Sequence, residues 1–131
     1  MMEQSLEFSR VPMLQGARVL IVEDDVLLLM ELESILLEAG AVIAGCCRTV
    51  KEGLAAADDR VAAAILDVRV GRETIAPVAR RLASRGTPFV FYTGQVPGDP
   101  ALAEWPGCTV LSKPSRPGTI VAALADLLGI S

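Results

Sequence analysis

The chain has 131 residues, which fits one domain, and 52% apolar against 21% charged residues indicates a folded globular protein. Its formal net charge of −4, without any basic stripe, argues against partners such as nucleic acid or an anionic membrane. There is no histidine, which excludes Ser-His and Cys-His catalysis and makes zinc a poor candidate. The start, residues 1–16, has neither signal-peptide nor membrane-span character, and we expect a cytoplasmic protein.

Strand and helix signals alternate along the chain behind the expected N-terminal tail, residues 1–16. Short apolar runs predict buried strands, and longer segments with caps and glycine stops predict helices. In chain order we expect a strand at 18–22, a helix at 25–39, a strand at 41–46, a helix at 50–58, a strand at 61–67, a loop at 68–73, a helix at 74–86, a strand at 88–93, a short helix begun by Asp99 and Pro100 and ended by Pro106, a strand at 109–113, and a helix capped by Ser115 that runs to Gly129. This alternation predicts an α/β domain over residues 17–131, with a parallel sheet and right-handed crossovers.

Polar side chains follow the predicted strands at the points where those strands end. Glu23, Asp24 and Asp25 follow the first strand, and Asp67 ends the run "VAAAILD". Thr93 and Gly94 follow the fourth strand, and Lys113 and Pro114 follow the fifth. Each has an ordinary structural explanation, such as a turn, a cap or a solvated charge, but parallel strands bring all of them to one edge of the sheet.

The chemistry that this combination favours is phosphoryl transfer to Asp67. Clustered carboxylates without histidine or cysteine favour Mg²⁺ as the metal cofactor. The metal, Lys113 and the Thr93 hydroxyl would share the oxygens of a transferring phosphoryl group. Asp67 would be the nucleophile and would form an acyl phosphate.

At residues 17–129 the sequence resembles a bacterial response-regulator receiver domain. The matching segments are "VLIVEDD", "AAAILDV", "FVFYTG" and "VLSKP", in this order and at suitable spacing. The resemblance implies a flavodoxin-like, doubly wound five-stranded parallel sheet of strand order 2-1-3-4-5, for which a receiver domain is a standard example. It also implies a cis Lys113–Pro114 peptide.

The resemblance also implies a role for each matching residue. Asp67 is the phosphoacceptor, Thr93 the switch hydroxyl and Lys113 the phosphate-binding lysine, and Gly94 offers a backbone contact to the phosphoryl group. The metal ligands would be Glu23, Asp24, Asp67 and the backbone carbonyl of Arg69.

Three departures from the family pattern point to a stand-alone, atypical subfamily. Val110 occupies the position of the usual aromatic switch residue. Pro97, Pro100 and Pro106 interrupt the fourth-helix region, and Arg69 places a guanidinium group two residues after the acceptor. We therefore expect the conformational switch to run through residues 94–107.

The function that we expect is that of a single-domain response regulator and not of a turnover enzyme. Its partners would be a sensor histidine kinase or phosphotransfer protein and an unknown output protein. A pseudo-receiver, a binding module that is not phosphorylated, is the alternative that Arg69 favours. An Asp-nucleophile phosphatase resembling D-x-D-x-[T/V] fits less well, because Arg69 replaces its second acid. Apolar residues on the first and last helices also suggest a homodimer or a kinase-docking surface there, unless residues 1–16 cover them.

Overall fold

The computed structural model describes residues 13–94 and 99–130. They form a five-stranded parallel sheet, a two-stranded hairpin, four α-helices and one short 3-10 helix. The elements are β1 (Arg18–Val22), α2 (Val26–Glu38), β2 (Val42–Cys47), α3 (Val50–Ala56), β3 (Ala63–Leu66), β4 (Arg69–Val70), β5 (Glu73–Thr74), α4 (Ala76–Ser84), β6 (Phe89–Thr93), η1 (Pro100–Leu102), β7 (Val110–Ser112) and α5 (Pro117–Leu127). Among these residues, no helix has the length and apolar character needed to cross a membrane.

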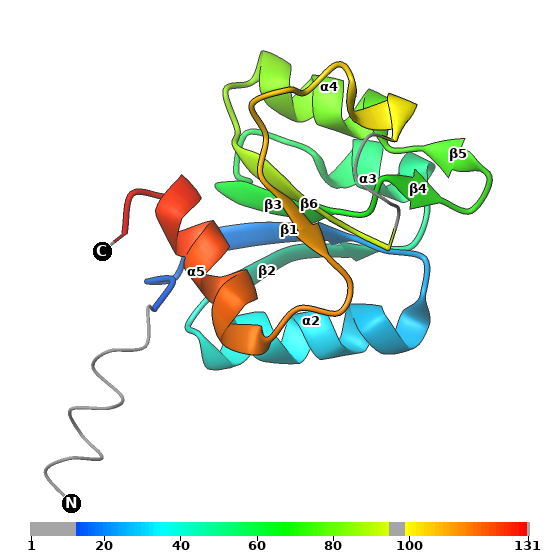
Figure 1. Ribbon diagram of the computed structural model, residues 1–131. Helices are drawn as coiled ribbons and strands as arrows, with labels where there is room; N and C mark the ends of the chain where they lie inside the picture. The colour runs from blue at the N-terminus through cyan, green and yellow to red at the C-terminus, as the bar shows by residue number, and fades with distance from the viewer. Residues whose placement is uncertain (1–12, 95–98, 131) are drawn as a thin grey trace, which may run out of the picture.

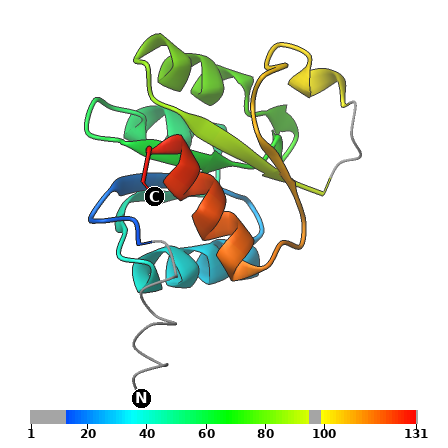
Figure 2. The same cartoon turned by 60° about the vertical axis from the view of Figure 1, so that its left-hand side comes forward.

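The main sheet has the order β2-β1-β3-β6-β7, which confirms the predicted 2-1-3-4-5 arrangement of an α/β doubly wound fold. Helices α2 and α5 cover one face of the sheet, and α3 and α4 cover the other (Figure 1). Figure 2 shows α5 crossing in front of the sheet, with α2 beside it on the same face. Since every strand of this sheet runs in the same direction, the carboxyl ends of β1, β3, β6 and β7 lie at one edge.

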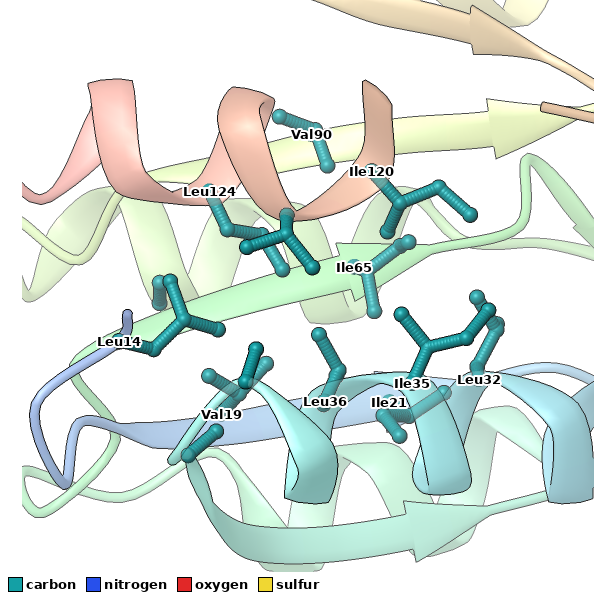
Figure 3. Close-up of a cluster of buried hydrophobic side chains, with 14 of the residues drawn as sticks. Leu14, Val19, Ile21, Leu32, Ile35, Leu36, Ile65, Val90, Ile120 and Leu124 are labelled. Atoms are coloured by element: carbon teal, nitrogen blue, oxygen red, sulfur yellow. The ribbon is translucent and has the colours of Figure 1, made fainter. Parts of the chain in front are cut away.

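Two apolar cores hold the three layers together. The first lies between the sheet and the α2/α5 layer, where Ile65, Leu36 and Leu124 are buried against one another (Figure 3). The second lies under α3 and α4 and includes Leu66 and Phe91. Strand β3 contributes alternate side chains to both cores, which explains why its sequence is apolar without interruption.

Leu14 belongs to the first core, although the sequence analysis placed it in an N-terminal tail. Its side chain is fully buried, and its N–H donates to the carbonyl of Ala39 at 2.7 Å. The N–H of Gly16 likewise donates to the carbonyl of Gly40 at 2.8 Å. The packed part of the chain therefore includes Leu14, while residues 1–12 of the expected tail lie outside the described residues.

Several local predictions were wrong. The expected loop at residues 68–73 contains most of the β4–β5 hairpin, with Gly71 in its turn at a φ of 63°. Ser115 does not cap the last helix: its hydroxyl donates to the carbonyl of Ser112, and α5 begins at Pro117 with Arg116 as an N-cap that makes no side-chain hydrogen bond. The short helix after Asp99 begins as predicted, with Asp99 as its N-cap and Pro100 as its first residue, but it is a single 3-10 turn that ends at Leu102.

The apolar surface expected on the first and last helices is present on α2 only. Val26, Leu27, Met30 and Leu37 of α2 are all exposed, with Leu27 at 76%. The large apolar side chains of α5 are buried or half-buried, and its exposed positions within 119–126 are Thr119, Ala122 and Asp126. Helix α5 turns its apolar residues to the sheet because Ile120, Val121 and Leu124 recur at helical spacing.

Candidate functional site

The carboxyl edge of the sheet brings three acidic side chains together. Glu23 and Asp24 follow β1, and Asp67 follows β3. One carboxylate oxygen from each lies within 4.8 Å of the others. The backbone sets this arrangement, because the N–H of Asp67 donates to the carbonyl of Val22 and extends the pairing of β3 with β1 to the end of both strands.

Lys113 reaches this acidic group from the end of β7. Its Nζ donates to Asp67 Oδ2 at 2.8 Å and lies 2.6 Å from Glu23 Oε1. The Lys113–Pro114 peptide is cis, as the resemblance implied. Burial opposes the charge of the lysine, but its hydrogen bonds with Asp67 and Glu23 outweigh that effect and raise its pKa. Lys113 is therefore a fixed cation beside Asp67.

Glu23 is the most buried carboxylate of the group. Its exposure is 1%, and burial raises its pKa to about 7, against the lowering effects of Lys113 and of the Asp25 N–H. That N–H donates to Glu23 Oε2 at 3.1 Å. A second cation at this point would favour the ionised form of Glu23, because it would oppose the cost of burying the charge.

The pKa of Asp24 is shifted in the opposite direction from that of Glu23. The backbone N–H of Gly71, in the β4–β5 turn, donates to Asp24 Oδ2 at 2.8 Å and lowers the pKa of that carboxyl group. The guanidinium group of Arg48 donates to the main-chain carbonyl of Asp24 at 3.4 Å. The β4–β5 hairpin therefore helps to fix the position of the Asp24 side chain at the sheet edge. Neither contact was predicted from the sequence; the glycine turn in "VGRE" was a signal only for the hairpin that brings Gly71 to Asp24.

The remaining residues singled out from the sequence lie around this group. Thr93 ends β6 and is 1% exposed, and its carbonyl accepts from the N–H of Lys113 at 3.0 Å. Gly94 follows it and is exposed. Arg69 begins β4, and its guanidinium group donates to Asp99 Oδ1 at 2.9 Å. The side chain of Arg69 is thus engaged with the start of η1, a contact that sequence reasoning did not find.

Tyr92 is a further residue that the sequence analysis did not single out. It is 1% exposed, its hydroxyl oxygen accepts from the N–H of Ser115 at 3.1 Å, and Lys113 Nζ lies 5.9 Å from its ring centroid. Its apolar ring lies in the first core, while its hydroxyl group supports the chain after the cis peptide. Tyr92 therefore supports the segment that carries Lys113.

Comparison with solved structures places this fold among known proteins. The chain is 39% identical to SdrG from Sphingomonas melonis Fr1, over 88% of this chain and 99% of that one, with a TM-score of 0.74. It is 23% identical to the receiver domain of the Erythrobacter litoralis PhyR response regulator, over 87% of this chain and 91% of that one, with a TM-score of 0.77. It is 21% identical to the response regulator PhyR from Brucella abortus, with a TM-score of 0.73. That match covers 98% of this chain but 53% of the other, so the chain spans about half the length of that protein.

The chain belongs to the response-regulator receiver domains. No protein-family model and no curated protein matches it. The matches to PhyR, at 23% identity or less, show the shared fold alone.

Proposed function

We propose that this receiver domain accepts a phosphoryl group on Asp67 from a partner protein, with Mg²⁺ as cofactor. The observation that supports the proposal most directly is the position of Asp67, where Lys113 Nζ lies 2.8 Å from its carboxylate and two further acidic side chains lie beside it. A carboxylate, a fixed cation and a cluster of oxygen ligands are what phosphoryl transfer to aspartate requires.

The proposed step is a balanced group transfer. A carboxylate oxygen of Asp67 forms a bond to phosphorus while the bond from phosphorus to the donor's imidazole nitrogen breaks, and that imidazole takes up a proton. Lys113 and the Thr93 hydroxyl would stabilise the phosphoryl oxygens, with the N–H of Gly94 as a further donor. A phosphohistidine donor must be another protein, because this chain contains no histidine.

The donor set fits Mg²⁺. The carboxylates of Glu23, Asp24 and Asp67 offer only oxygen, the ligand that hard divalent cations prefer. The proposed ligands are these three side chains and the backbone carbonyl of Arg69. Bound Mg²⁺ would neutralise negative charge on the phosphoryl oxygens.

The pseudo-receiver alternative rested on the guanidinium group of Arg69. That group is engaged with Asp99, and the cation in contact with Asp67 is Lys113. This arrangement favours the phosphorylated receiver over the alternative. We also propose a cytoplasmic location, where an ATP-dependent histidine kinase or a phosphotransfer protein would supply the phosphoryl group. The signal would then pass to an output protein or onward along a phosphorelay.

Labelling with a small phosphodonor tests this proposal. Phosphoramidate and Mg²⁺ should add one phosphoryl group to the full chain, detected by intact-mass measurement, and chelation of Mg²⁺ should prevent it. Asp67→Asn should reduce labelling to background, whereas Asp126→Asn, on the exposed side of α5, should leave it unchanged. Labelling that persists in Asp67→Asn, or that does not require Mg²⁺, would overturn the assignment.

A further inference from the structure

A hollow beside the site is lined by basic side chains. It lies between the start of α3 and the β4–β5 hairpin, which are neighbours in Figure 1, and has a volume of about 260 Å³. Arg48, Lys51 and Arg72 line it and are exposed, and Glu73 is the one acidic residue of the lining. The hollow therefore carries a local excess of positive charge on a chain whose formal net charge is −4.

Lys51 and Arg72 differ from several other cations of the chain because they form no ion pair within the described residues. Arg69 forms an ion pair with Asp99, and Arg80 forms a bidentate ion pair with Glu104. Within residues 13–94 and 99–130, neither Lys51 nor Arg72 has a carboxylate within ion-pair distance. Their charges are therefore available to an external partner.

The hollow is joined to the proposed metal site through the main chain. Gly71, which lines the hollow, donates its N–H to Asp24, and Arg48, on the opposite wall, donates to the Asp24 carbonyl. A group bound in the hollow would consequently lie next to the sheet edge that carries Asp67. Any protein that exchanges a phosphoryl group with Asp67 must approach this edge.

The size and charge of the hollow limit what it can hold. A volume of about 260 Å³ is below the range of about 300–1,000 Å³ that is usual for small-molecule pockets, so it suits one or two side chains. A nucleic acid would require a longer basic stripe than three cations on an acidic chain provide. Carboxylate side chains of a protein segment match both the size and the charge.

We propose that Arg48, Lys51 and Arg72 form a docking site for an acidic segment of the protein that exchanges its phosphoryl group with Asp67. This inference rests on the proposed function and adds a recognition element to it. Charges at the rim of an interface mainly raise the rate of association and make it depend on salt. The site would therefore discriminate between phosphodonors by the charge that flanks their phosphohistidine.

Two synthetic phosphohistidine peptides test the docking site with the full chain. One carries a flank of glutamates and the other an equal flank of glutamines, and the rate of Asp67 labelling is measured for each at low and at high salt. The glutamate peptide should label about 3- to 10-fold faster at low salt, since each exposed ion pair contributes up to a few-fold. The advantage should vanish near 1 M salt, where the screening length is about 3 Å.

Charge-reversal variants locate the effect. Lys51→Glu and Arg72→Glu should each reduce the ratio of the two rates, and the double variant, which makes the hollow net negative, should bring it to one or below. Arg85→Glu, an exposed cation at the end of α4 outside the hollow, is the matched control and should keep the ratio of the unchanged chain. A ratio of one in the unchanged chain, or a ratio that Arg85→Glu lowers as strongly as the variants in the hollow, would overturn the docking site.

Phosphoramidate separates this inference from the proposed function. It has no flank, so it should label the unchanged chain and all the variants at similar rates. If phosphoramidate labels Asp67 while the two peptides react equally, the docking site fails and the proposed function stands. If phosphoramidate labels neither the unchanged chain nor any of the variants, the proposed function itself fails.

Discussion

Arg69 and Asp99 form an ion pair that joins the proposed phosphorylation site to the segment after β6. Arg69 Nη2 lies 2.9 Å from Asp99 Oδ1, and the same oxygen accepts from the N–H of Ala101 at 2.9 Å. The Asp99 side chain is 4% exposed, whereas that of Arg69 is 45% exposed. A residue two positions after Asp67 thus holds the start of η1 in place.

Loss of the arginine should destabilise the protein. Arg69→Ala leaves the Asp99 carboxylate buried beside fewer donors, which costs more than the loss of a solvated pair. We expect a clear fall in melting temperature, measured by calorimetry, and a smaller fall for Arg69→Lys. Arg60→Ala, which breaks the exposed pair with Asp58, is the control and should change the melting temperature little. Equal shifts for the two alanine variants would contradict the prediction.

The conformational switch should run through the segment that this ion pair holds. Val110 on β7 is 42% exposed and carries no polar atom that a phosphoryl group could attract. If Thr93 moves toward the phosphoryl group, Gly94 and the chain behind it must follow. Residues 95–98 of the predicted 94–107 region lie outside the described residues, so the prediction is made for residues 99–107.

Hydrogen exchange with and without beryllofluoride and Mg²⁺ measures this effect. Peptides over residues 99–107 should change their exchange rate, and those over residues 120–125 of α5, which include the buried Ile120, Val121 and Leu124, should serve as the unchanged reference. Arg69→Ala should raise exchange in 99–107 already without beryllofluoride, because η1 has lost its anchor. A response confined to β7, with 99–107 unaffected, would show that the switch takes another route.

The stability of the metal-free protein should depend on pH through Glu23. The folded protein raises the pKa of Glu23 from 4.5 to about 7, so it holds a proton that the unfolded chain releases. The resulting stability is fully present below pH 4.5 and is lost as pH rises to about 7. From pH 4.5 to about 7, the free energy of unfolding of the unchanged chain should fall by at most about 3 kcal/mol relative to that of Glu23→Gln. Urea unfolding with a chelator present measures both.

Mg²⁺ provides the control for this pH dependence. A divalent cation favours the ionised carboxylate, so saturating Mg²⁺ should stabilise the unchanged chain more at pH 8 than at pH 5. In Glu23→Gln, the stabilisation by Mg²⁺ should differ less between pH 8 and pH 5. A difference curve between the two proteins that is flat from pH 4.5 to 7 would show that Glu23 ionises normally.

The proximity of the main site residues was predictable because it follows from sheet geometry. Parallel strands place their carboxyl ends together, so Asp67 and Lys113 had to meet once their strands were recognised. The roles of these residues remain proposals. The Arg69–Asp99 pair was not predictable, since it depends on where the chain folds after β6, and no local pattern records that. The two-residue strands β4 and β5 were missed because they are too short to show a periodicity.

Self-association should depend on the exposed apolar residues of α2. Leu27 is 76% and Met30 is 59% exposed, and both lie on the outer side of a helix whose inner residues fill the first core. Exposed apolar surface of this kind usually marks a protein interface. We expect the full chain to form a homodimer, measured by light scattering, and Met30→Glu to dissociate it without changing the fold.

The alternative to a homodimer is that residues 1–12 cover the exposed apolar residues of α2, and light scattering distinguishes the two. Met13, the first described residue, lines a groove of about 530 Å³ between α2 and α5, together with Ile35 and Val121. The shortened chain must begin at Met13, because Leu14 belongs to the core. If the full chain is monomeric and only the shortened chain associates, residues 1–12 cover the surface and the homodimer prediction is wrong. If both forms are dimeric and Met30→Glu dissociates both, α2 forms the interface, since a charge at that position cannot be buried in it without a large cost.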